Sequence, residues 1–100
     1  MAEEKQFEEK VKKLLKNRGA WVLKTWGGGY QRAGIPDLLV CYKGRFMGIE
    51  LKAEKGMVSR LQEIELDGIR KAGGCSMILR PSYLLDFEDM LDEIDKEEKE

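Results

Sequence analysis

Two short apolar runs of the sequence carry charged residues, and this pattern limits the fold more than any other feature of the chain. Residues 34–40 contain Asp37, and residues 46–53 contain Glu50 and Lys52. Because successive residues of a β-strand point to opposite faces of its sheet, Glu50 and Lys52 must share the face opposite to their apolar neighbours. A buried carboxylate or ammonium is costly unless it is paired or bound to a metal ion. The two runs therefore predict a site at which these charges meet.

The three charged side chains allow two interpretations. Glu50 and Lys52 can form an ordinary ion pair on an exposed sheet face, which would contribute little to stability. Alternatively, Asp37 from the neighbouring strand completes, together with Glu50, a cation site of hard oxygen ligands. We favour the cation site because Asp37 follows a proline at the start of its strand and an acidic helix precedes it. Such a site suggests metal-assisted phosphodiester chemistry.

The composition excludes several classes of enzyme. The chain has no histidine, so it can form neither a Ser-His-Asp triad nor a histidine-ligated zinc site. It also has no GxxxxGK[ST] loop, and we therefore expect no nucleotide cofactor. With 100 residues, 42% of them hydrophobic and 37% charged, the chain should form one globular domain, residues 1–100, with a single functional site.

The apolar runs and the cysteines predict the environment of the protein. No run approaches the roughly 18 residues of a membrane span, and the N-terminus lacks the apolar centre of a signal peptide. We therefore expect a cytoplasmic protein without membrane contact. Cys41 and Cys75 both lie in apolar, strand-like stretches, which predicts reduced and buried thiols rather than a disulfide.

The net charge of -1 hides an uneven distribution of charge. Residues 1–85 carry 16 Lys and Arg against 10 Asp and Glu, a balance of +6, whereas residues 86–100 carry 2 against 9, a balance of -7. The basic body is suited to binding phosphate groups. The acidic tail, from about residue 95 to residue 100, is expected to be a solvated helix end that frays.

The hydrophobic periodicity predicts seven elements in the order α-β-β-β-α-β-α. The predicted helices cover residues 3–18, 59–71 and 83–95, and the predicted strands cover residues 20–26, 37–42, 46–53 and 75–79. Gly19 should end the first helix, and Ser59 and Ser82 should cap the other two. The second and third strands should pair antiparallel, and the helical crossover should bring the fourth strand parallel to a neighbour. Trp21 is expected to be a core residue.

Three motifs follow one another along the chain: G-x-P-D at residues 34–37, E-x-K at residues 50–52 and S-x-x-Q at residues 59–62. In this order they resemble the VRR-NUC group of the PD-(D/E)xK nuclease superfamily, in particular its stand-alone, phage-type members, over roughly residues 4–80. The resemblance implies an α/β, restriction-endonuclease-like fold in which helices flank a mixed four-stranded sheet. It also implies a nuclease similar to the phage and archaeal Holliday-junction resolvases.

The resemblance assigns roles to four residues of the two charged runs. Asp37 corresponds to a bridging metal ligand, Glu50 to a second ligand, and the backbone carbonyl of Leu51 to a third. Lys52 corresponds to the catalytic lysine, which would orient the attacking water or screen the developing negative charge. The implied cofactor is Mg²⁺ or Mn²⁺, which would polarise the scissile phosphate.

The first and second helices each contribute a further candidate. Glu4 and Glu8 both border the apolar stripe of the first helix, and the resolvase-like spacing to Gly19 selects Glu8 as a metal ligand. The resemblance gives Gln62 a catalytic, water-positioning role. As the third residue of the capping box, however, Gln62 can equally serve only to bond the backbone of Ser59.

Four residues are candidate DNA contacts. Tyr30 and Arg32 lie in the loop that follows Trp26, and the aromatic and glycine content of this loop suits stacking on irregular nucleic acid. Lys55 and Arg60 can contact phosphates, which positions DNA without reading its sequence. The alternative for each residue is an ordinary loop or surface position without a special role.

We therefore expect a metal-dependent endodeoxyribonuclease that cleaves branched DNA, with Holliday junction resolution by a homodimer as the leading function. A four-way junction needs two incisions, and one compact domain supplies one active site. The final helix, with Leu84, Met90 and Leu91, is the candidate dimer surface. The alternatives are a nuclease that processes flaps, nicks or ends, and a non-catalytic DNA-binding module that retains the fold.

Overall fold

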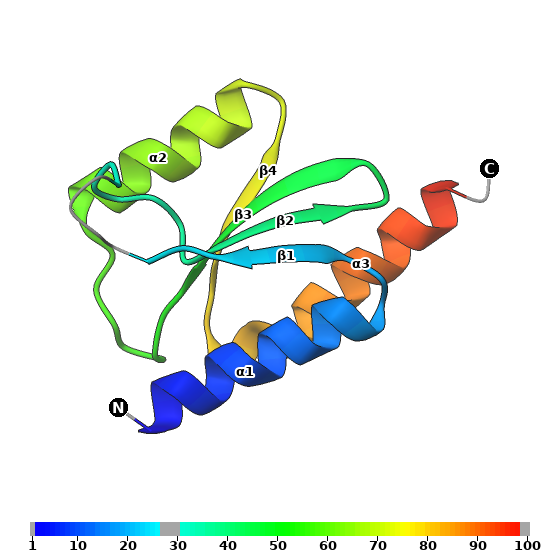
Figure 1. Cartoon of the computed structure of the whole chain (residues 1–100), viewed down its shortest axis with the longest axis horizontal. Helices are drawn as coiled ribbons and strands as arrows, with labels where there is room; N and C mark the ends of the chain where they lie inside the picture. Colours follow the sequence, from blue (N-terminus) through cyan, green and yellow to red (C-terminus); the bar gives the residue numbers. More distant parts are fainter. Residues whose placement is uncertain (1, 27–30, 99–100) are drawn as a thin grey trace.

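The computed structural model describes residues 2–26 and 31–98, which follow the predicted order of elements (Figure 1). The helices are α1 (Ala2–Asn17), α2 (Arg60–Lys71) and α3 (Leu84–Glu98), and the 3-10 turn η1 (Pro81–Tyr83) precedes α3. The strands are β1 (Trp21–Lys24), β2 (Leu38–Tyr42), β3 (Arg45–Leu51) and β4 (Cys75–Leu79). Within this described part, no helix is long and apolar enough to cross a membrane.

The four strands form one mixed sheet in the order β1-β2-β3-β4, in which only β3 and β4 are parallel. In the tight turn between β2 and β3, Lys43 and Gly44 both adopt a positive φ, as a two-residue hairpin turn of type I′ requires. Leu38 lies opposite Ile49, which brings the next residues, Asp37 and Glu50, close together. The predicted fold, a mixed four-stranded sheet flanked by helices, is confirmed.

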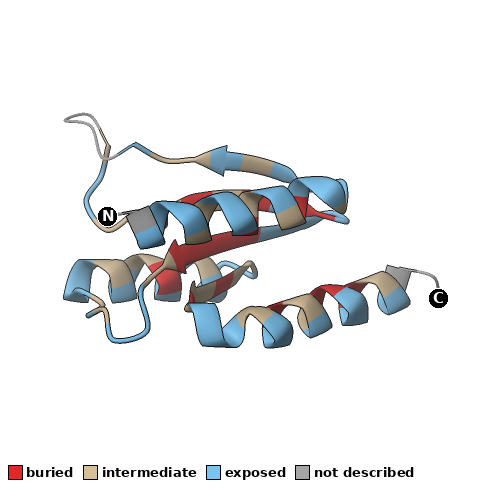
Figure 2. Ribbon diagram, turned by 90° about the horizontal axis from the view of Figure 1, so that it is seen from below, coloured by how far each residue is buried: buried red, intermediate tan, exposed pale blue. Residues whose placement is uncertain are grey.

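Helices cover both faces of the sheet, with α1 and α3 on one face and α2 on the other (Figure 1). The main core lies between the sheet and the pair α1 and α3. Its fully buried side chains are Val11, Leu15, Leu38, Val40, Met47, Ile49 and Leu91. Figure 2 shows the buried residues concentrated in the central strands, while the outward sides of α1 and α3 are exposed. Because Met47 and Ile49 face this core, Glu50 points toward α2.

The cap predictions for α1 and α2 are confirmed. Gly19 follows α1 with a φ of 85°, and the Ala20 N–H donates to the Leu15 carbonyl at 3.0 Å, which is the bonding of a glycine-ended helix. At the start of α2, the Gln62 N–H donates to Ser59 Oγ and the Ser59 N–H donates to Gln62 Oε1. The predicted capping box therefore fixes the first turn of α2.

The end of the chain departs from the prediction in two ways. Ser82 does not cap α3 but lies within η1, where its N–H and hydroxyl both donate to the Glu54 carboxylate. The last helix continues to Glu98 instead of fraying near residue 95. The reason is a set of contacts to the sheet: Asp95 accepts a hydrogen bond from the Tyr42 hydroxyl at 2.5 Å, and Glu97 pairs with Arg45.

Two predictions of burial were wrong, for one physical reason. Trp21 is 57% exposed and Cys41 is exposed, although both are in strands. On the α2 side of the sheet, α2 packs on β3 and β4 and leaves β1 and β2 uncovered. The open sheet face, as we call it, consists of Trp21, Leu23, Cys41 and Phe46; the three large side chains are 57%, 46% and 44% exposed.

Candidate active site

Asp37 sits immediately before β2, where three hydrogen bonds fix it and the preceding residue, Pro36. The Thr25 N–H donates to the Asp37 carbonyl at 2.9 Å, and the Thr25 hydroxyl donates to the Pro36 carbonyl at 2.8 Å. The Asp37 carboxylate itself accepts a hydrogen bond at Oδ2 from the Leu51 N–H at 2.9 Å. Asp37 is therefore held between β1 and β3, at the end of β3 that carries Glu50.

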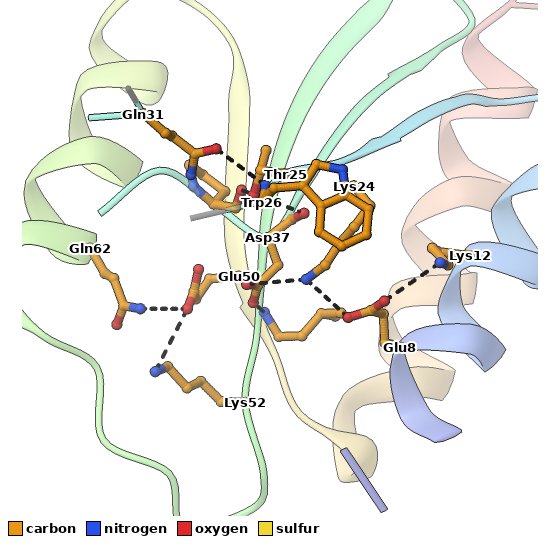
Figure 3. Close-up of polar contacts among 12 residues, drawn as sticks. Glu8, Lys12, Lys24, Thr25, Trp26, Gln31, Asp37, Glu50, Lys52 and Gln62 are labelled. Atoms are coloured by element: carbon orange, nitrogen blue, oxygen red, sulfur yellow. Dashed lines mark hydrogen bonds and ion pairs between the residues drawn. The ribbon is translucent and has the colours of Figure 1, made fainter. Parts of the chain in front are cut away.

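Glu50 is a carboxylate buried in the sheet, with only 3% of its surface exposed. Its Oε2 accepts a hydrogen bond from Gln62 Nε2 at 2.6 Å and lies 3.6 Å from Lys52 Nζ, whereas its Oε1 has no hydrogen-bond partner among the described residues (Figure 3). Burial and the nearby Asp37 carboxylate raise the pKa of Glu50 to about 7, and Lys52 only partly opposes this rise. Glu50 and Lys52 are thus not the exposed ion pair of the alternative interpretation.

Gln62 reaches Glu50 from α2 while it completes the capping box. Its Oε1 accepts from the Ser59 N–H at 2.9 Å, and its Nε2 donates to Glu50. Lys52, which follows β3, is held in place by a hydrogen bond from its N–H to the Leu79 carbonyl at 3.1 Å. The structure therefore brings Asp37, Glu50, Lys52 and Gln62 together at one end of the sheet.

Glu8 joins this group from α1 through a lysine that the sequence did not single out. Lys24 Nζ lies 3.0 Å from Glu8 Oε1 and 3.8 Å from Asp37 Oδ1 (Figure 3). Burial alone would raise the pKa of Glu8, but Lys24 and Lys12 lower it below its usual value. Glu4, the alternative to Glu8, is exposed one turn earlier in α1. The only sequence signal for Lys24 is a charge in the strand next to Asp37.

A cleft of about 560 Å³ opens beside these residues. Lys24, Trp26, Gln31, Arg32, Asp37 and Gln62 contribute to its lining. Trp26 is 79% exposed, and its backbone N–H donates to Gln31 Oε1 at 3.2 Å. The cleft thus extends from the Asp37 carboxylate to the exposed side chain of Trp26.

The candidate DNA contacts are more scattered than the catalytic candidates. Tyr30 lies outside the described residues. The Arg32 guanidinium is exposed but bound to the Glu65 carboxylate of α2, with N–O distances of 2.7 and 2.8 Å. Lys55 and Arg60 are exposed, and Arg60 lies 3.6 Å from Glu63. Only Arg32 among the described candidates lines the cleft.

The donor set at Glu50 fits a divalent cation, although the acidic side chains are not closely clustered. In residues 2–26 and 31–98, no three Asp, Glu, His or Cys side chains form a group that could hold a metal ion. Glu50 nevertheless presents a buried oxygen without a partner among the described residues. Burial and the negative charge of Asp37 both disfavour its ionised form and raise its pKa. A cation bound by these two carboxylates would relieve both effects.

Comparisons with known proteins agree with the motifs. No protein-family model and no curated protein sequence matches the chain. Its structure is similar to a VRR_NUC domain, with a TM-score of 0.67 and 25% sequence identity over 93% of this chain and 94% of that chain. It is also similar to Hjc, a Holliday junction resolvase from the archaeal hyperthermophile Archaeoglobus fulgidus, with a TM-score of 0.57 and 21% identity over 76% and 67% of the two chains. The resemblance to the VRR-NUC group is therefore confirmed.

Proposed function

Because the chain has the fold of a VRR-NUC domain, we propose that it is a structure-specific DNA endonuclease that hydrolyses phosphodiester bonds with the help of Mg²⁺ or Mn²⁺. The observation that carries this proposal is the buried Glu50 carboxylate, which has one unpartnered oxygen and lies with Asp37, Lys52 and Gln62 beside an open cleft. A structural role alone leaves this arrangement unexplained, because a buried carboxylate with an unsatisfied oxygen destabilises the fold.

The residues that would hold the ion are Asp37, Glu50, the Leu51 carbonyl and Glu8. When bound, a divalent cation would polarise the scissile phosphate and lower the pKa of a water molecule. The Leu51 N–H already fixes Asp37 Oδ2, so Oδ1, which lies 3.8 Å from Lys24 Nζ, is the oxygen that would face the ion. Gln62 keeps Glu50 oriented through its hydrogen bond to Oε2, so that Oε1 is the oxygen available for coordination.

Lys52 is the proposed catalytic lysine. Its ammonium lies 3.6 Å from Glu50 Oε2 and is partly exposed. From this position it can hold a water molecule for attack on the phosphate, or donate a hydrogen bond to a phosphate oxygen as negative charge develops there. Its backbone hydrogen bond to β4 limits the main-chain movement of this residue.

The proposed substrate is branched DNA, with four-way junctions first among the candidates. The support is the fold shared with an archaeal Holliday junction resolvase and the cleft beside the carboxylates, in which Trp26 offers a face for base stacking. Tyr30 and Arg32 would contact DNA at the branch, and Arg32 would exchange Glu65 for a phosphate. Lys55 and Arg60 are exposed and would contact phosphates outside the cleft.

We further propose a homodimer, because two incisions in one junction need two active sites. The dimer surface suggested by the sequence, the final helix, is less suitable, since Leu91 is fully buried in the core of the subunit. The open sheet face offers three large, exposed apolar side chains on β1 and β3 instead, with Cys41 of β2 between them. Contiguous apolar surface of this kind marks interaction sites.

The deciding experiment compares cleavage of four-way, flap, nicked, duplex and single-stranded DNA of matched sequence with Mg²⁺, Mn²⁺ or EDTA. We expect metal-dependent cleavage of the four-way junction, which Asp37→Ala and Lys52→Ala abolish. Activity in EDTA, or activity that survives Asp37→Ala, would contradict the proposed chemistry. Preferred cleavage of flaps or nicks would select the end-processing nuclease, and binding without cleavage of any substrate would select the non-catalytic module.

A further inference from the structure

Lys24 occupies the space between two of the proposed metal ligands. Its Nζ lies 3.0 Å from Glu8 Oε1 and 3.8 Å from Asp37 Oδ1, so one ammonium links a carboxylate of α1 with a carboxylate at the start of β2 (Figure 3). All three side chains are at least two-thirds buried. In a partly buried site of this kind, each carboxylate needs a nearby positive charge.

The backbone keeps this ammonium near the site. Lys24 is the last residue of β1 and pairs with Leu38, the residue after Asp37. The next residue, Thr25, donates its N–H to the Asp37 carbonyl at 2.9 Å. Because the main chain is fixed next to Asp37, the ammonium can move only by rotation of its own side chain.

Lys12 provides an internal comparison, because it is also paired with Glu8. Its Nζ lies 3.5 Å from Glu8 Oε2 and 3.0 Å from Glu9 Oε1, both within α1, and its side chain is 20% exposed against 27% for Lys24. Lys12 thus balances the outer oxygen of Glu8. Lys24 lies instead on the inner side, between Glu8 and Asp37.

We propose that Lys24 is a tethered counter-cation that occupies the position between Glu8 and Asp37 and leaves it when a divalent ion is bound there. The inference rests on the proposed metal-dependent nuclease function. Two cations cannot share this space, because like charges a few ångströms apart repel strongly in a partly buried site. Lys24 therefore sets the affinity for the ion. Since Lys24 also lines the cleft, the displaced ammonium stays where a DNA phosphate would lie.

The test is a titration with Mn²⁺, in which the free ion is followed by electron paramagnetic resonance, without DNA. Lys24→Met and Lys24→Gln should bind Mn²⁺ more tightly than the wild type, by about tenfold, because the competing charge is gone. Lys12→Met removes the same charge from the neighbourhood of Glu8 but not from between Glu8 and Asp37, and it should change the affinity by no more than about twofold, as expected for pairs within one helix. A gain of affinity separates this role from a structural one, since damage to the site would weaken binding.

Thermal unfolding gives a second readout. In EDTA, Lys24→Met should unfold at a lower temperature than the wild type, because Glu8 and Asp37 then repel each other. In saturating Mn²⁺, the unfolding temperature of Lys24→Met should equal or exceed that of the wild type in the same buffer. Weaker or unchanged Mn²⁺ binding in both Lys24 variants, or equal gains in Lys24→Met and Lys12→Met, would overturn the inference. The proposed metal site itself would be overturned by a different result. In that case the wild type binds no Mn²⁺, and Asp37→Asn does not change the Mn²⁺ binding of any variant.

Discussion

Gln62 and Glu50 are joined by a hydrogen bond of 2.6 Å from Nε2 to Oε2, although they come from different layers of the fold. The carbonyl oxygen of the same Gln62 amide accepts from the Ser59 N–H. The two roles that the sequence left as alternatives for Gln62 are thus compatible, because an amide has separate donor and acceptor atoms. As a result, the start of α2 and the buried carboxylate hold each other in place.

Replacement of Gln62 by Met should lower the cleavage rate, and the loss should be larger than a reduced fraction of folded protein would explain. The variant loses the donor that orients Glu50, and a hydrogen bond to a charged group contributes about 1.5–3 kcal/mol, which corresponds to roughly tenfold or more in rate. Single-turnover cleavage of a four-way junction in Mg²⁺ measures the effect.

The matched control for Gln62→Met is Ser59→Ala, which removes only the cap. We expect Ser59→Ala to lower the free energy of unfolding by about 1 kcal/mol and to leave the single-turnover rate nearly unchanged. If both variants lose the same activity, the stability of the first turn of α2, rather than the bond to Glu50, controls the rate.

The stability of the metal-free protein should fall as the pH rises from about 5 to about 8. Burial and the Asp37 carboxylate raise the pKa of Glu50 from 4.5 to about 7, so between these values the folded chain retains a proton that the unfolded chain has lost. The bound proton therefore stabilises the folded chain at the acid end of this window. Above pH 7 Glu50 is ionised in both states, so this stabilisation is lost and the free energy of unfolding levels off. The difference is at most about 3 kcal/mol. Urea unfolding in EDTA at a series of pH values measures it.

Glu50→Gln is the control for this pH dependence, because it cannot ionise and keeps a similar shape. Its free energy of unfolding should vary less between pH 5 and pH 8 than that of the wild type, and it should be the more stable protein at pH 8. A decline of the same size in both proteins would assign the effect to another group.

The features that the sequence predicted well depend on contacts between near neighbours. The Gly19 cap and the box formed by Ser59 and Gln62 each involve residues within a few positions of one another. The convergence of Asp37 and Glu50 follows from the register of one hairpin. Such relationships can be read from spacing alone.

The features that the sequence did not predict depend on distant parts of the chain. Ser82 would be a good cap locally, but Glu54 binds its N–H and hydroxyl instead. Trp21 is exposed because α2 does not extend over β1 and β2, and the periodicity of a strand does not show how much of the sheet a helix covers. Lys24 reads as an ordinary strand charge until α1 brings Glu8 beside it.

Replacement of Gly34 by Ala should be among the most destabilising small changes in the chain. Gly34 has a φ of 87°, and a Cβ there would lie 2.5 Å from the Leu61 carbonyl oxygen at the start of α2. The strain of the left-handed conformation and the displacement of α2 should together lower the free energy of unfolding by more than about 2 kcal/mol. Urea unfolding at neutral pH measures the loss.

Gly73→Ala is the control for this change. Gly73 also has a positive φ, of 98°, but a Cβ there would meet no atom within 4 Å. The variant should therefore lose only the conformational term, about 1 kcal/mol. Equal losses in the two variants would show that the backbone conformation alone, and not the close approach to α2, requires glycine in the G-x-P-D motif.

The open sheet face should hold the proposed homodimer together. Trp21→Ser removes its largest side chain, and loss of a central aromatic residue from an interface typically costs about 2 kcal/mol or more, or at least tenfold in the dissociation constant. Sedimentation velocity over a range of concentrations measures this shift toward the monomer.

The control is Trp26→Ser, which removes a more exposed tryptophan from the cleft and not from the open sheet face. Trp26→Ser should weaken junction binding and leave the dimer intact, because Trp26 lines the cleft in which we propose that DNA binds. A wild type that remains monomeric at every concentration would exclude the dimer, and equal dissociation of both variants would place its interface elsewhere.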